Sequence, residues 1–104
     1  MSQMAVAGVG DPPTPLPVHF ALEQNYPNPF NPATTINYQL PTSSFVVLNV
    51  YDLLGREVRT LVNERQAPGN HSVMFDASSL SSGVYLYRLV AGTYHNTKKL
   101  LLLK

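Results

Sequence analysis

The sequence predicts an all-β domain, an Ig-like antiparallel β-sandwich of about seven strands. Apolar residues alternate with polar ones in several short runs, which is the period of half-buried strands. Turn-forming residues separate these runs. No window keeps the apolar period of a helix for three turns. A seven-stranded barrel is the alternative architecture.

The composition agrees with a small β domain and excludes several classes of function. A chain of 104 residues allows one domain, and 12% charged residues beside 9 prolines suit a turn-rich fold. The net charge of +1 argues against nucleic acid as a partner. Without cysteine, neither a disulfide nor a thiolate metal site can form. Neither a signal peptide nor a transmembrane segment is recognisable, so we expect any export signal of this kind to lie elsewhere in a longer protein.

The beginning of the chain predicts a linker followed by one folded domain. Residues 1–17 are small and rich in proline, which is typical of a semi-extended linker. We therefore expect the folded domain to span residues 18–104. Its first element is predicted to be a short edge strand over residues 18–24, in which Val18, Phe20 and Leu22 alternate with other residues.

A proline knot, residues 25–32, comes next and holds three X-Pro bonds. Each proline fixes its own φ and moves the preceding residue out of the helical region, so a stiff bend is expected. Asn28 and Asn31 are expected to close local turns with their own side chains. Tyr26 and Phe30 are expected to anchor the bend on the core.

Six further strands are predicted, and they cover residues 34–40, 45–51, 57–62, 71–75, 83–91 and 94–104. We expect Gly55 and Gly92 to turn the chain, residues 63–70 to form a polar loop and Asp76 to cap one helical turn. Inward positions supply the expected core, which is Ile36, Tyr38, Leu48, Val50, Val73, Phe75, Tyr85 and Leu89.

The last predicted strand has leucines on both faces. In residues 98–104, four consecutive leucines are bracketed by lysines. Either Leu100 and Leu102 or Leu101 and Leu103 must then face away from the core. The strand is therefore either covered on both faces inside the domain or a docking strip for a partner, with lysines that discourage aggregation at the edge.

No group of residues predicts catalysis or a cofactor. His19, His71 and His95 lie on separate segments without ligand spacing, and the acidic residues are scattered beside turns. A calcium ion held by two loops is the one metal site that the sequence leaves open. Tyr85 and Tyr87 are expected to face inward rather than to stack on sugars, and Tyr85 is suited to a backbone hydrogen bond at a strand corner.

Four stretches together carry a family resemblance. They are residues 26–32, 50–58, 83–85 and 98–104, read as YPNPFNP, VYDLLGREV, GVY and KKLLLLK. In this order they resemble the C-terminal sorting domain of the type IX secretion system, found on cargo proteins of Bacteroidetes and related bacteria. The Ig-like domain of the flagellar hook-capping protein opens in nearly the same way. The tryptophan that the family often has before Asp76 is replaced by Phe75.

The resemblance implies a signal without chemistry of its own. Such domains are recognised in the periplasm, take the attached N-terminal cargo across the outer membrane by way of an outer-membrane shuttle, and are removed by a sortase that attaches the cargo to the cell surface. It implies an exported protein, no cofactor, and cleavage upstream of Val18. The residues that match the motifs tied to recognition are Gly83, Val84, Tyr85, Lys99, Leu103 and Lys104.

Two other functions remain open on the sequence alone. The first is a structural module that works by subunit packing, as in the hook-capping protein. The second is a carbohydrate-binding appendage of an enzyme, which exposed aromatic residues on one flat face would support.

Overall fold

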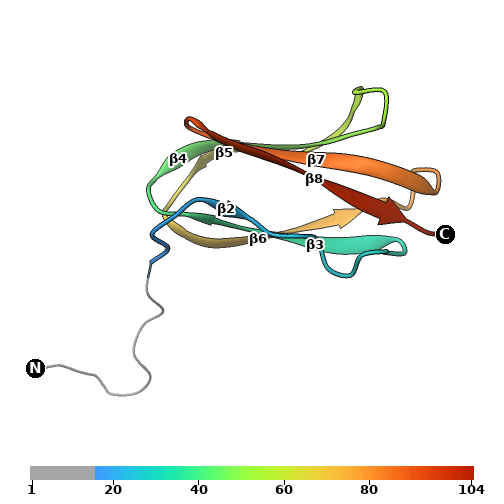
Figure 1. Ribbon diagram of the computed structural model, residues 1–104, viewed down its shortest axis with the longest axis horizontal. Helices are drawn as coiled ribbons and strands as arrows, with labels where there is room; N and C mark the ends of the chain where they lie inside the picture. Colours follow the sequence, from blue (N-terminus) through green and yellow to red (C-terminus); the bar gives the residue numbers. More distant parts are fainter. Residues whose placement is uncertain (1–15) are drawn as a thin grey trace, which may run out of the picture.

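The computed structural model describes residues 16–104 and shows two antiparallel sheets packed face to face (Figure 1). One sheet has the order β2-β3-β6 and the other β5-β4-β7-β8, and no helix occurs within the described residues. Two separate sheets confirm the sandwich and exclude the barrel. The strands are β2 (Ala21–Leu22), β3 (Ala33–Leu40), β4 (Ser44–Tyr51), β5 (Glu57–Gln66), β6 (Gly69–Asp76), β7 (Gly83–Ala91) and β8 (Tyr94–Leu102).

The core lies between the sheets and consists of the inward residues of each strand. Of the eight residues predicted to form it, seven are buried. Val73, on the edge strand β6 of the smaller sheet, is only partly buried. The hydroxyl of Tyr85 donates to the carbonyl of Ser81 at 2.7 Å, which confirms the expected backbone bond at the start of β7. Asp76 accepts from the amide of Ser78 as expected, but the following residues form a turn closed by the Leu80 amide and the Ala77 carbonyl rather than the predicted helical turn.

Two elements differ from their predicted bounds by three or more residues, whereas the others differ by at most two. The first strand pairs with β3 only through Ala21 and Leu22, and Val18 is 80% exposed. Phe20 instead stacks on Tyr94 of the other sheet, with ring centroids 5.2 Å apart. The predicted polar loop over residues 63–70 was wrong, because β5 continues to Gln66 and only two residues connect it to β6. Backbone pairing with β4 keeps this polar stretch extended although few of its side chains are buried.

The proline knot connects the two sheets. Tyr26 pairs with Thr35 of β3, and Phe30 pairs with Leu102 of β8. All three X-Pro peptide bonds of the knot are cis. Phe30 is 2% exposed and anchors the bend as predicted, whereas Tyr26 is 79% exposed, so its prediction as an anchor was wrong. Directly opposed residues point to the same side of a sheet, so Tyr26 follows Thr35 to the outer face.

The asparagines of the knot bond to distant residues rather than only within a local turn. The side chain of Asn28 accepts from the amide of Leu101 at 3.0 Å, in place of the expected bond to its own backbone. The buried side chain of Asn25 donates to the hydroxyl of Thr34 and to the carbonyl of Pro27. The knot is thereby fixed to both sheets through side chains as well as backbone.

Candidate functional site

The two faces of β8 have different environments. Leu100 and Leu102 are almost completely buried, with exposed fractions of 1% and 0%. Leu101 is partly exposed on the opposite side, and Leu103, just beyond the strand, is 50% exposed. The prediction that one leucine pair faces away from the core is therefore confirmed, and Leu101 and Leu103 are that pair.

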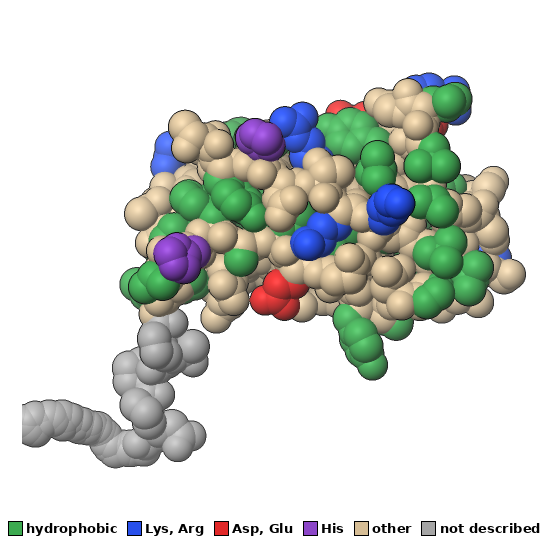
Figure 2. All heavy atoms as spheres, viewed as in Figure 1, with side chains coloured by type: hydrophobic (Ala, Val, Ile, Leu, Met, Phe, Trp, Pro, Cys, Tyr) green, Lys and Arg blue, Asp and Glu red, His purple; other side chains and the backbone are tan. Residues whose placement is uncertain are grey.

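Outward residues of three neighbouring strands meet at the end of the four-stranded sheet. Tyr51 of β4 lies opposite Leu86 of β7, and Val84 lies opposite Leu101 of β8. These four residues are partly exposed. We call this group of residues the terminal face. Its members are Tyr51, Val84, Leu86, Leu101 and Leu103. Figure 2 views the two sheets from their edge and shows hydrophobic side chains at the end of the molecule where β8 stops.

Cationic residues border the terminal face. Lys99 is exposed and lies opposite Leu86, and Arg88 lies one step farther from the end, opposite Thr97. Lys104 stands at the corner, where its amide donates to the hydroxyl of Ser82 and its ammonium donates to the carbonyl of Ser78. The surface thus combines an apolar centre with a cationic border on the β8 side, whereas the acidic Glu57 lies opposite Tyr51 on the β5 side.

The backbone edge of β8 beside the terminal face is already used by the proline knot. The amide of Phe30 donates to the carbonyl of Leu101, and the amide of Leu103 donates to the carbonyl of Phe30, both at 2.9 Å. The side chain of Gln24 donates to the carbonyl of Lys99 at 2.6 Å. Side chains, rather than free backbone groups, are therefore what this end of β8 presents to solvent.

Comparison with known proteins shows the family of the chain. The model of the family described as secretion system C-terminal sorting domain matches residues 24–103. The chain belongs to this family. Membership confirms the resemblance to the type IX sorting domain and gives the domain the role of a C-terminal secretion signal. No comparison bears on the link to the hook-capping protein, which stays a prediction.

The fold of this sorting domain also occurs in a solved structure. It is dimeric latent PorU from Porphyromonas gingivalis, with a TM-score of 0.59 and 21% sequence identity. The match covers 91% of this chain and 10% of the PorU chain, so the sorting domain spans about a tenth of that protein's length. No curated protein is significantly similar in sequence.

The predicted recognition residues divide into two groups. Val84, Lys99 and Leu103 lie on or beside the terminal face, and Lys104 lies at its corner. Gly83 and Tyr85 present no side chain there. Gly83 has a positive φ of 152°, which few other residues adopt, and Tyr85 is 8% exposed with its ring toward the core.

Three members of the terminal face were absent from the predicted set, namely Tyr51, Leu86 and Leu101. The sequence did contain a usable indication. If Tyr85 and Tyr87 point inward, then Leu86 between them must point outward, because side chains alternate along a strand. Tyr51 could not be assigned in this way, since its place beside Leu86 depends on pairing between β4 and β7.

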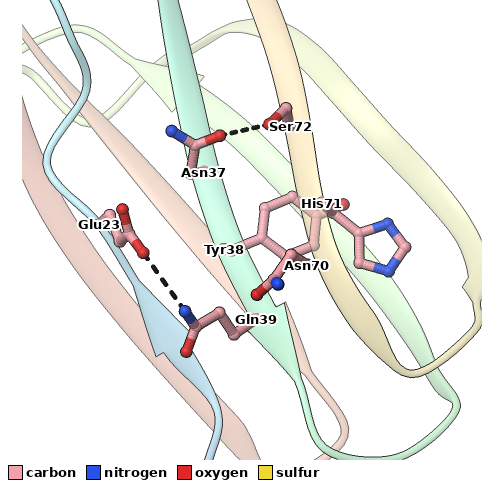
Figure 3. Close-up of a pocket in the computed structure, with 7 residues that line it drawn as sticks. All are labelled: Glu23, Asn37, Tyr38, Gln39, Asn70, His71 and Ser72. Carbon is pink, nitrogen blue, oxygen red and sulfur yellow. Dashed lines mark hydrogen bonds between the residues drawn. The ribbon is translucent and has the colours of Figure 1, made fainter. Parts of the chain in front are cut away.

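A second candidate is a polar cleft of about 310 Å³ on the three-stranded sheet (Figure 3). Asn37 and Ser72 are hydrogen-bonded to each other, and Gln39 donates to Glu23. The ring of Tyr38 is buried and stacks on His71, so neither ring forms a flat wall for a sugar. The cleft thus offers amides and a carboxylate that already bond to one another. Its lining residues are Glu23, Asn37, Tyr38, Gln39, Asn70, His71 and Ser72.

The described residues contain no group of three or more histidine, cysteine, aspartate or glutamate side chains placed to hold a metal ion. In residues 16–104 we also find no helix with the length and hydropathy needed to cross a membrane. Burial raises the pKa of Tyr87 to about 12, but the phenol is part of the fold, where it donates to the carbonyl of Glu23.

Proposed function

We propose that this sorting domain is the part of an exported protein that the type IX machinery recognises, and that recognition uses the terminal face. The single observation that supports this most is the outward pair Leu101 and Leu103 at the end of β8, where the alternating inward leucines Leu100 and Leu102 are buried. A contiguous apolar surface with a polar border is typical of a protein-interaction site. Val84 and Lys99, which match family motifs, belong to the same surface or its border.

Recognition of this surface is by side-chain contact rather than by strand addition. Strand addition requires a free row of backbone donors and acceptors at a sheet edge. At Lys99, Leu101 and Leu103 those groups are bonded to Gln24, Asn28 and Phe30. A partner strand would have to remove Phe30 from the core, which is costly for a residue that is 2% exposed.

The further steps follow the family resemblance. The partners are an outer-membrane shuttle and a sortase of the type IX system, with a cargo domain attached ahead of the sandwich. The protein passes through the periplasm and ends at the cell surface or outside the cell. The sortase cuts upstream of Val18, and the sorting domain itself catalyses nothing. Its scattered acidic and histidine residues are consistent with that role.

An export assay tests the proposal directly. Residues 1–104 are fused behind a Sec signal peptide and a folded reporter in a host with a type IX system. The variant carries Leu103→Ser and Lys104→Ala, and we expect surface reporter to fall at least tenfold with an unchanged melting temperature. Phe45→Ser is a matched control, because Phe45 is also 50% exposed but is the second residue of β4, at the opposite end of the same sheet.

Two results would contradict the proposal. If the parent fusion stays in the periplasm, the sorting role itself fails. If the Leu103 and Lys104 variant remains folded and is exported as well as the parent, the sorting role stands but the terminal face is not the recognised surface.

A further inference from the structure

The turn between β4 and β5, residues 52–56, is stiffly built. The Asp52 carboxylate accepts from the amides of Leu54 and Arg56, at 2.9 and 3.0 Å, and forms an ion pair with the Arg56 guanidinium at 2.8 Å. Gly55 has a φ of 84°, and its amide donates to the carbonyl of Asp52. The hydrogen bond from the Arg56 amide is the main cause that lowers the pKa of Asp52, so the Asp52 carboxylate is ionised at neutral pH.

This turn holds two large apolar side chains in solvent. Leu53 is 65% exposed and Leu54 is 79% exposed, and neither belongs to the core or to the partly buried residues packed against it. Single exposed leucines are ordinary on protein surfaces. These two leucines are adjacent, and five hydrogen bonds within the turn fix its backbone. The turn therefore presents both side chains in a defined direction, which lowers the conformational entropy lost on binding.

The turn stands beside the terminal face. It follows Tyr51, which belongs to that face, so residues 52–56 project toward the end where β7 begins and β8 ends. Figure 1 shows the turn rising above the outer side of the four-stranded sheet. The strands β4 and β8 are separated only by β7, which places them about 10 Å apart. One partner with an interface of ordinary size, about 800 Å² on each side, would cover both features.

We propose that Leu53 and Leu54 are a second contact for the protein of the type IX machinery that binds the terminal face, and that they enter an apolar pocket of that protein. This inference rests on the proposed function and adds to it a contact outside the terminal strand. The alternative, insertion into an anionic lipid surface, agrees less well with the local charges. Arg56 is already paired with Asp52, and the next residue, Glu57, is also acidic.

The test uses a double variant that carries both Leu53→Ser and Leu54→Ser. Its export is compared with that of the parent fusion in the same assay. We expect surface reporter to fall about tenfold or more while the melting temperature is unchanged, as for loss of a binding hot spot. Met74→Ser is the matched control, because Met74 is 72% exposed on the outer side of the other sheet, and we expect it to be exported like the parent.

A flotation assay with vesicles of phosphatidylethanolamine and phosphatidylglycerol separates the two kinds of partner. We expect neither the parent nor the Leu53 and Leu54 variant to float. Flotation of the parent alone would identify a lipid contact and overturn the protein pocket. Export of the variant at the parental level, or an equal loss from Met74→Ser, would also overturn the inference. If the parent is not exported at all, the proposed function fails, and this inference falls with it.

Discussion

The proline knot and the β4–β5 turn are both tight bends, but they satisfy their polar groups in opposite ways. The knot bonds to β8 through Asn28 and Phe30, which are more than seventy positions away from their partners, and it buries a phenylalanine. The turn satisfies its amides with its own Asp52 and leaves Leu53 and Leu54 in solvent. The first bend contributes Phe30 to the core between the sheets, whereas the second contributes no residue to it.

This difference separates stability from recognition within one small domain. A bend that depends on distant contacts cannot change without disturbing the core. A bend that is complete in itself can carry exposed side chains at little cost to folding. The comparison therefore predicts large stability losses around the knot and almost none at the turn.

The largest effect is expected from Phe30→Ala. Phe30 is 2% exposed and its ring lies 6.0 Å from that of Phe75, so truncation leaves a cavity between the sheets. The free energy of unfolding should fall by about 3–5 kcal/mol in urea denaturation. A loss below about 1 kcal/mol would show that the knot is not part of the folding unit.

Raising the pH should weaken the same region by a smaller amount. The Tyr87 hydroxyl donates to the carbonyl of Glu23 and accepts from the amide of Asn25, the first residue of the knot. Burial raises its pKa from 10.0 to about 12, so the folded state retains the phenolic proton longer than the unfolded state. Stability is then unaffected below pH 10 and falls by roughly 2–3 kcal/mol as the pH rises to 12.

Tyr87→Phe provides the control for this pH effect. The variant keeps the ring but leaves the amide of Asn25 without its acceptor, which should cost about 1–3 kcal/mol at neutral pH. Its stability should then depend less on pH above 10 than that of the parent. An unchanged alkaline slope would assign the effect to another group, such as Tyr38, whose pKa burial also raises.

The smallest effect is expected at the turn. Replacing Leu53 and Leu54 with serine should change the free energy of unfolding by no more than about 0.5 kcal/mol, because both side chains are already in water. Thermal unfolding of the two proteins measures this. A clear destabilisation would mean that the leucines pack on the sandwich in solution, and the contrast between the two bends would not hold.

Alternation in the sequence was enough to predict most strands and their faces. The bounds of β7 agree with the prediction, and its inward residues Tyr85 and Leu89 are buried. This works because side-chain direction along a strand is a local property. The turn at Gly55 was also predictable from local sequence, since glycine readily takes the positive φ that a tight hairpin turn requires.

Contacts between distant segments were not predictable in this way. Tyr26 and Phe30 look alike as aromatic anchors in a proline-rich stretch, yet only Phe30 is buried. Their difference depends on which strand each one pairs with. The terminal face has the same origin, because Tyr51 joins Leu86 only through the pairing of β4 with β7. Motifs indicated part of this surface, and sheet order supplied the rest.

The stacking of Phe20 on Tyr94 fixes the place where the chain enters the sandwich. The contact places the entry of the sandwich at the start of β8, whereas the terminal face lies at its other end. Nine residues of strand separate the two by about 30 Å. If the domain carries a cargo as proposed, the cargo joins the sandwich at the end away from the terminal face. Cargoes of unrelated shape would then share one point of attachment, opposite the surface proposed to be recognised.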